Sequence, residues 1–156
     1  MTFTRPNRNP DWCDTVYGPM NVKKARCREL FESALREVPA WLSTAMAVRN
    51  LVVSPFGLKT QLEGEGHFLT RMPVVKDEID YYETGIDDRH LSFTLALKQH
   101  SGSAYLTTNI WFNSWLGKTY LVAVTPGHIL ATRQMISKVA KPVQRTLGGF
   151  EKAMST

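Results

Sequence analysis

Large apolar and smaller polar residues alternate most clearly in the middle of the chain. Over residues 91–98 every second position is Leu or Phe, and alternation with period two is typical of a strand with one buried face. The neighbouring ranges 78–84 and 104–113 are rich in Tyr, Thr, Ile and Leu, and turn residues occupy 85–89 and 101–103. The pattern therefore predicts consecutive antiparallel hairpins.

The region before these strands changes to a helical period. Residues 11–17 still alternate and predict one short strand. Asn21 is a good N-cap for an amphipathic helix that we expect to run through about Glu37. Pro39 ends this helix and suits the first position of a second one, expected over 40–53.

A long apolar stripe at helical spacing lies between residues 118 and 141, with Pro126 on the opposite side of the wheel. One long helix, kinked or begun at Pro126, is the economical interpretation. A strand over 119–125 followed by a helix from residue 126 is the alternative. Residues 61–72 favour one or two weak strands, and residues 142–156 predict a frayed tail.

This order of elements indicates a single α+β domain over residues 11–141, preceded by an extended arm of residues 1–10. The 156 residues, 43% hydrophobic and 21% charged, suffice for one globular core. No stretch approaches the ~18 consecutive apolar residues of a membrane span. The first ten residues lack the apolar region of a secretory signal, so we expect a cytoplasmic protein without a membrane span.

Charge and cysteine content exclude several classes of site. The formal charge is +5, but basic residues share helix faces with acidic ones and form no run of five, so no nucleic-acid partner is expected. Cys13 and Cys27 form no CxxC pair, and no histidine stands at zinc-ligand spacing. We expect neither a metal nor a cofactor.

Four short motifs carry a resemblance to known proteins. They are Asp-Trp-Cys-Asp at 11–14, Val-Arg-Asn-Leu-Val at 48–52, Gly-Ile-Asp-Asp-Arg-His-Leu-Ser-Phe at 85–93, and Asn113 with Gly117, Tyr120, Pro126 and His128. In order and spacing they resemble a bacterial family known as a domain of unknown function, from Asp11 to about Lys138.

The order of elements resembles the helix-grip fold of the START and Bet v 1-like (SRPBCC) superfamily. This resemblance implies a curved antiparallel β-sheet that wraps a long C-terminal helix. It also implies two short helices between the first and second strands, and a cavity between sheet and C-terminal helix.

Arg49 is the most informative polar residue, because it lies near the middle of the apolar arc of the expected second helix. A guanidinium stays charged when buried and needs partners. One interpretation is a structural ion pair with Asp14, Asp87 or Asp88. The others are contact with an anionic ligand at the cavity mouth, or snorkelling to solvent.

Two histidines are candidates for chemistry. His128 lies on the packed side of the last helix, where it either contacts a ligand or bonds a buried backbone or carboxylate group. His90 follows Asp87 and Asp88 in a turn, and a neighbouring carboxylate can orient an imidazole as a general base. Asp-rich turns also form for backbone reasons alone.

Large aromatic residues suit the walls of an apolar pocket. The candidates are Trp12, Trp41, Phe93, Trp111 and Tyr120. Because Trp111 and Phe112 are adjacent on a strand, they point to opposite faces, so one of them lies outside or in an interface. This arrangement favours a partner surface such as a homodimer.

The residues favour a non-enzymatic module that holds a small apolar or amphipathic ligand, lipid or polyketide-like, between sheet and C-terminal helix. Arg49, Tyr120 and His128 would supply the polar contacts. The alternative is a cyclase-, aromatase- or hydrolase-like enzyme using His128 or His90 with Arg49. A third hypothesis is a protein-interaction module.

Overall fold

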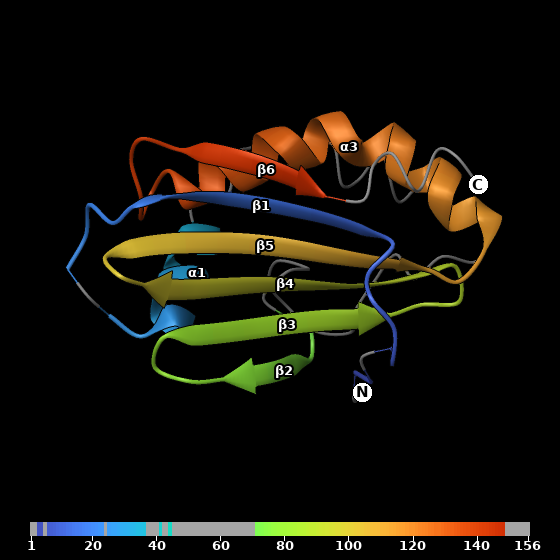
Figure 1. The fold of residues 1–156 in the computed structure, drawn as a ribbon, viewed down its shortest axis with the longest axis horizontal. Coiled ribbons are helices and arrows are strands. Elements are labelled where there is room, and N and C mark those ends of the chain that lie inside the picture. The colour runs from blue at the N-terminus through green and yellow to red at the C-terminus, as the bar shows by residue number, and fades with distance from the viewer. Residues whose placement is uncertain are drawn as a thin grey trace.

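The computed structural model describes residues 3–4, 6–23, 25–36, 41, 44 and 71–148. They form an α+β unit with a six-stranded antiparallel sheet of order β2-β3-β4-β5-β1-β6. The strands are β1 (Trp12–Pro19), β2 (Val74–Asp77), β3 (Tyr81–Asp87), β4 (Leu91–His100), β5 (Ser103–Phe112) and β6 (Gln144–Gly148), and the helices are α1 (Cys27–Arg36) and α3 (Trp115–Ile136). Figure 1 shows α3 following one long edge of the sheet.

The predicted hairpins are confirmed. A tight turn joins β4 to β5, in which Ser101 and Gly102 both have positive φ, as a two-residue hairpin turn requires. β3 extends three residues beyond the predicted 78–84, so the expected turn begins later. Gly85 lies within the extended part, where a Cβ would come within 3.0 Å of the Phe93 carbonyl oxygen and 3.1 Å of the Phe3 ring of the N-terminal arm.

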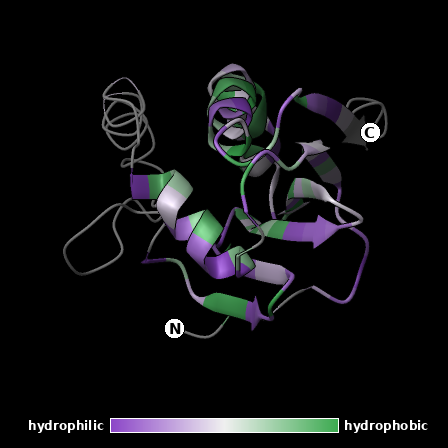
Figure 2. Cartoon of the chain, turned by 90° about the vertical axis from the view of Figure 1, so that its left-hand side faces the viewer, coloured by the Kyte–Doolittle hydropathy of each residue, from purple (hydrophilic) through white to green (hydrophobic). Residues whose placement is uncertain are grey.

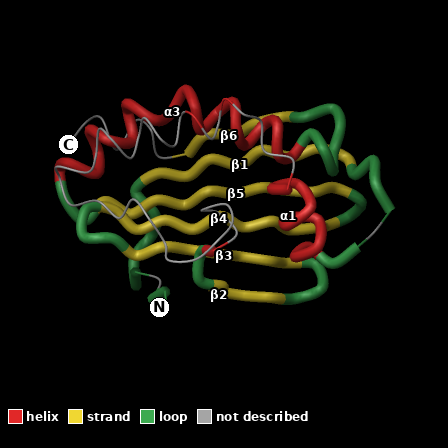
Figure 3. Tube along the Cα trace, turned by 180° about the vertical axis from the view of Figure 1, so that it is seen from behind, coloured by secondary structure: helices red, strands yellow, loops and turns green. Residues whose placement is uncertain are grey.

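The helices cover one face of the sheet, here called the inner face (Figure 3). Because directly opposed residues of antiparallel strands share a face, the register assigns Trp12, Asp14 and Val16 of β1 to the inner face together with their partners on β5. α1 packs Phe31 edge-on against Tyr82 of β3. α3 packs Leu121 into a second apolar cluster with Trp12, Leu91 and Ile110.

α3 confirms the prediction of one long C-terminal helix, and the alternative of a strand over 119–125 is wrong. The helix has 22 residues and contains Pro126, which lies on its exposed side. Gly117 near its N-terminus packs directly against the carbonyl oxygen of His90. This close approach fixes α3 on the end of β4.

Three expectations need correction or lie outside the described residues. α1 begins at Cys27 rather than after Asn21, and it is the one helix between β1 and β2 that the described residues cover from end to end. The second helix expected over 40–53 falls outside the described residues, apart from Trp41 and Thr44, which are helical. The weak strands expected over 61–72 also fall largely outside them.

The tail after residue 142 is not frayed where the structure describes it. Gln144–Gly148 form β6, which pairs antiparallel with β1 at the edge of the sheet. The ladder satisfies backbone groups of β1 that would otherwise face solvent. It also brings Arg145 to the inner face, where Arg145 is the cross-strand partner of Val16.

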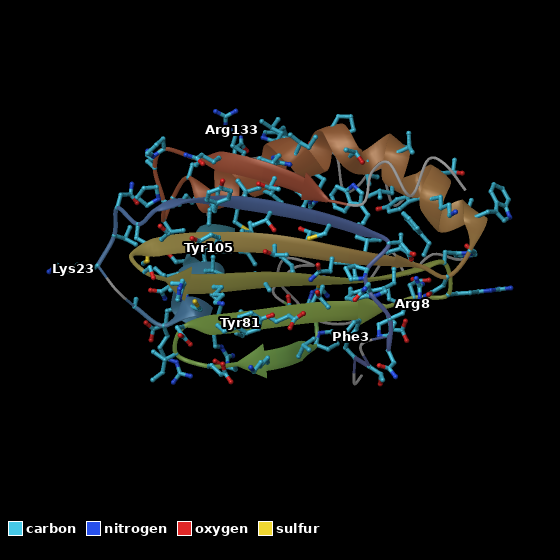
Figure 4. The ribbon with its side chains drawn as sticks, viewed as in Figure 1. Phe3, Arg8, Lys23, Tyr81, Tyr105 and Arg133 are labelled. Atoms are coloured by element: carbon cyan, nitrogen blue, oxygen red, sulfur yellow. The ribbon has the colours of Figure 1, made fainter. Side chains whose placement is uncertain are left out.

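The N-terminal arm crosses the other face of the sheet, the outer face (Figure 4). The indole Nε1–H of Trp111 donates to the carbonyl oxygen of Arg8 (2.9 Å). The Arg8 guanidinium donates in turn to the carbonyl oxygen of Phe112 (2.8 Å). Trp111 is the outward-facing member of the Trp111–Phe112 pair, yet it is only 2% exposed, so the chain's own arm covers it.

Candidate functional site

A buried carboxylate occupies the middle of β1. Asp14 is 0% exposed and points to the inner face. Its Oδ2 accepts a hydrogen bond from His128 Nε2 (3.0 Å) and another from Arg145 Nη1 (2.8 Å). β1, α3 and β6 therefore meet at one ion pair, which we call the Asp14 cluster.

Arg145 is held rigidly in this cluster. Its Nη2 donates to the carbonyl oxygen of Ile129 (2.7 Å) and to Thr132 Oγ1 (2.8 Å). Burial lowers the pKa of the Arg145 guanidinium, and the Asp14 carboxylate partly offsets this shift. The planar guanidinium is pre-organised, so it loses little side-chain entropy for each hydrogen bond that it forms. Arg145 is therefore suited to hold the Asp14 carboxylate in place.

His128 has the geometry of an oriented imidazole. A carboxylate only accepts hydrogen bonds, so Nε2 carries the hydrogen that reaches Asp14. The ring lies edge-on to Trp12, with 5.4 Å between ring centroids, and the side chain is 20% exposed. With Nε2 fixed in this way, Nδ1 is directed away from Asp14 and can serve a ligand as acceptor or base.

Several buried polar atoms on the inner face have no hydrogen-bond partner within the described part of the chain. They are Trp12 Nε1, Asp14 Oδ1, Thr84 Oγ1 and Thr108 Oγ1. In the sheet register Asp14 opposes Thr108, Thr108 opposes Leu95, and Leu95 opposes Thr84. Asp14, Thr108 and Thr84 thus lie in one row across the sheet, with Leu95 between the two threonines, and Trp12 lies two residues before Asp14 on β1. We call Trp12, Asp14, Thr84 and Thr108 together the polar row.

Such atoms are costly in a folded protein. A buried donor or acceptor without a partner costs about 1–3 kcal/mol, and more when it is charged. Native proteins usually satisfy such groups with protein, water or ligand atoms. A polar ligand group that bonds to the polar row would remove this free energy cost, so the polar row is the part of the inner face where such a group would bind most favourably.

The structure brings together several of the residues that the sequence singled out. Trp12 belongs to the apolar cluster under α3, with Phe93 and Tyr120 packed against it, and His128 touches Trp12. Trp41 donates from Nε1 to Gln134 Oε1 of α3 (3.2 Å).

Two candidates are not part of this group. Trp111 lies on the outer face beneath the arm. Arg49 lies outside the described residues, so its predicted role is untested.

Asp87, Asp88 and His90 form a separate network at the β3–β4 turn. Ser92 Oγ donates to Asp87 Oδ1, and Asn113 Nδ2 donates to Ser92 Oγ and to the carbonyl oxygen of Asp88. His90 Nδ1 shares a hydrogen bond with Ser114 Oγ, 3.0 Å away, just before α3. His128 lies about 20 Å further along α3 at 1.5 Å per residue, so the structure does not bring the two histidines together.

Sequence reasoning missed Arg145, because it assigned residues 142–156 to a frayed tail. The usable signal was local and weak: residues 143–147 contain the β-branched Val143 and Thr146, a residue type that is enriched in strands. No such signal pairs Arg145 with Asp14, which lies 131 residues earlier.

A hollow of about 470 Å³ opens near the β4–β5 turn, lined among others by Met20, Asp80 and Gln99. None of the predicted site residues lines it. The cavity expected between sheet and C-terminal helix stays a prediction.

Within the described ranges, no three His, Cys, Asp or Glu side chains are placed to hold a metal ion. No helix of these ranges combines the length and apolar character needed to cross a membrane.

Comparison with known proteins decides the family. The sequence profile of a family described as a protein of unknown function (DUF2867) matches residues 8–135. The chain belongs to the DUF2867 family. No curated protein and no solved structure matches it. In this DUF2867 protein the matched range contains Asp14 and His128 but ends before Arg145, so the family match covers two of the three side chains of the Asp14 cluster.

Proposed function

We propose that this DUF2867 protein binds a small amphipathic molecule against the inner face of its sheet, beside α3. The observation that carries the proposal is the polar row, with its buried, unpartnered oxygen and nitrogen atoms. The surrounding walls are apolar and aromatic, and small-molecule sites typically combine such walls with a few convergent polar groups.

The atoms of the polar row define what the ligand must offer. Asp14 Oδ1 only accepts, so it selects a hydroxyl or amine hydrogen. Trp12 Nε1 only donates, so it selects an oxygen acceptor. A hydroxylated, otherwise apolar molecule meets both needs, and lipid or polyketide-like compounds are of this kind.

The proposal includes a helix-grip architecture for the whole domain. Its support is the order of elements: an antiparallel sheet followed by a long helix that packs on one of its faces. In a fold of this type, the ligand lies between sheet and C-terminal helix. Tyr120 and His128 of α3 face that space.

The test uses the full chain and one pair of matched variants. Native mass spectrometry of the purified protein should show a bound mass that organic extraction removes. Thr108→Val removes a hydroxyl of the polar row at nearly constant volume, and we expect it to lower retention of the extracted compound about fivefold. Thr107→Val, on the outer face, is the control.

Thr107 suits this purpose because its Oγ1 bonds Thr15 Oγ1 on the far side of the sheet (3.0 Å). Its substitution should leave retention unchanged. Absence of any bound mass, or equal retention by the two variants, would overturn the proposal.

A second candidate function rests on the contact between Asp14 and His128. A buried carboxylate that fixes one imidazole nitrogen is the arrangement by which a histidine is oriented as a general base. In an enzyme of the hydrolase kind, His128 Nδ1 would take a proton from water or from a ligand hydroxyl. Chromogenic aryl esters test this function, since His128→Asn should lower the hydrolysis rate at least 100-fold. Equal rates for the wild type and the variant would exclude it.

A further inference from the structure

The side of α3 that faces solvent is apolar. Trp115 is 75% exposed, Val122 64% and Leu130 46%, and Pro126 lies between the last two on the same side. We call these four residues the outer ridge. Most globular helices carry charges on their outward side, and clustered exposed apolar residues mark an interaction site.

The charges that α3 itself carries have one sign. Residues 115–136 contain no Asp or Glu, and their Lys and Arg residues are Lys118 and Arg133. Within α3, Lys118 and Arg133 bound a stretch of fourteen residues, 119–132, without any charge. The outer ridge is therefore an apolar strip with a cation at each end.

The shape of this surface is convex. Figure 1 shows α3 along the margin of the molecule, and Figure 2, seen nearly along the helix, shows α3 raised at the edge of the sheet. A protruding ridge of this kind can contact a flat surface along its whole length. Its partner must accept Trp115, Val122 and Leu130 while offering negative charge near both ends of the ridge.

We propose that the outer ridge docks on the surface of an anionic lipid bilayer. Helices at such surfaces bury apolar side chains to the level of the acyl boundary, while their Lys and Arg side chains contact anionic headgroups. Trp115, at the end of the ridge, matches the preference of tryptophan for the interface between water and lipid. This inference goes beyond the proposed ligand site, because it rests on the opposite side of α3.

A second copy of the chain fits the outer ridge less well. In an antiparallel pairing of two α3 helices about Pro126, Lys118 of one copy would lie near Arg133 of the other. Like charges placed in this way repel. An acidic groove in another protein would need carboxylates at both ends of the ridge, whereas an anionic bilayer supplies negative charge along its whole surface.

The experiment is flotation of the full chain with vesicles of phosphatidylcholine alone or with 30% phosphatidylglycerol, at low salt. The wild type should float with the anionic vesicles only, and added salt should weaken binding. Emission of Trp115 should shift to the blue on binding, and Trp115→Phe should abolish this shift.

Matched variants separate the apolar and the charged contribution. Val122→Ser with Leu130→Ser should lower partitioning at least tenfold, because it removes apolar area from the ridge. Ile79→Ser is the control, since Ile79 is 66% exposed but lies before β3, away from α3. Arg133→Gln should lower partitioning onto anionic vesicles about fivefold, and Lys23→Gln should not.

Each result decides the proposal, provided that far-ultraviolet circular dichroism shows the variants folded. Binding to anionic vesicles that is lost in the Val122/Leu130 variant and kept in the Ile79 variant supports it. Failure of the wild type to float overturns it, as does equal binding by all variants. A dimer in gel filtration that the Val122/Leu130 variant dissociates also overturns it, since a second copy would then occupy the ridge.

Discussion

Among the single residues, Asp14 is a buried carboxylate whose charge must be compensated by its neighbours. Its carboxylate has no exposed surface and depends on Arg145 and His128 for compensation. Removing one member of a buried ion pair is far costlier than the net worth of the pair, because the other charge stays buried and alone.

Asp14→Asn should therefore destabilise the protein by about 3–5 kcal/mol. The reason is that the Arg145 guanidinium, whose side chain is 19% exposed, keeps its charge and loses its counter-ion. Asp77→Asn is the control, because Asp77 pairs with the half-exposed Arg26 and Arg28 and should cost less than about 1 kcal/mol. Urea unfolding monitored by fluorescence measures both values, and similar losses for the two variants would contradict this account.

The buried thiol of Cys27 predicts an alkaline loss of stability. Burial raises the pKa of Cys27 above its ordinary value of 9.0. Above pH 9 the thiol therefore ionises in the unfolded chain before it ionises in the folded one, which stabilises the unfolded state. The contribution of the Cys27 thiol to the free energy of unfolding is fully present below pH 9, and it is lost as the pH rises through the pKa of Cys27 in the folded protein.

Unfolding by urea between pH 7 and 10 measures this effect. The slope from a single thiol is at most about 1.4 kcal/mol per pH unit, and Cys27→Ala should remove it at the cost of a lower stability at pH 7. Cys13 and Tyr82, whose pKa values burial also raises, keep their own slopes in both proteins, so the difference between the two proteins reports Cys27. An unchanged slope between pH 9 and 10 in Cys27→Ala would show that this thiol is not protected.

At the scale of elements, two glycines of α3 differ sharply in their surroundings. A Cβ on Gly117 would collide with the carbonyl oxygen of His90, whereas a Cβ on Gly127 would meet no atom within 4 Å. Gly127→Ala should stabilise the protein by about 0.5–1 kcal/mol, because it removes the conformational freedom of a helical glycine. Gly117→Ala should destabilise it by about 1–3 kcal/mol through overpacking.

Thermal unfolding of both variants checks this pair. A loss of stability in Gly127→Ala would mean that the outward side of α3 is packed against something. A neutral Gly117→Ala would mean that the start of α3 can move away from β4.

Elements with a strong period were predictable, and elements defined by distant partners were not. The alternation of β4 and the apolar stripe of α3 carry their own signal, because each buries one face along its whole length. β6 is five residues long and is held mainly by its ladder to β1 and by Arg145. Its stability comes from tertiary contacts, which a local pattern does not record.

The same distinction applies to the candidate site. Trp12, Tyr120 and His128 were found because they stand on the apolar side of predicted elements. The pairing of His128 with Asp14 requires the register of β1 under α3, and Arg145 requires β6. The β3–β4 turn shows the converse, since Asp87, Asp88 and His90 are neighbours in sequence and do form a local network.

At the scale of the whole molecule, the N-terminal arm packs across the outer face of the sheet and covers Trp111. Removal of residues 1–8 should expose Trp111, which would lose the carbonyl oxygen of Arg8 as acceptor and the cover that keeps it 2% exposed. We expect a red shift of tryptophan emission and a loss of about 2–3 kcal/mol. Trp111→Phe in the shortened chain should abolish the shift, and unchanged emission after truncation would show that the arm does not cover Trp111.

The order of the strands has a consequence for synthesis on the ribosome. β1 is translated before the other strands of this sheet, yet its two neighbours are β5 and β6, and its Thr15 bonds Thr107, which follows 92 residues later. Nascent β1, with its carboxylate at Asp14, must therefore stay unpaired until β5 has been translated. Such long-range pairing slows folding, so β2 to β5 can pair in the order of translation while β1 joins the sheet late, and protection of β1 by chaperones should raise the yield of folded protein.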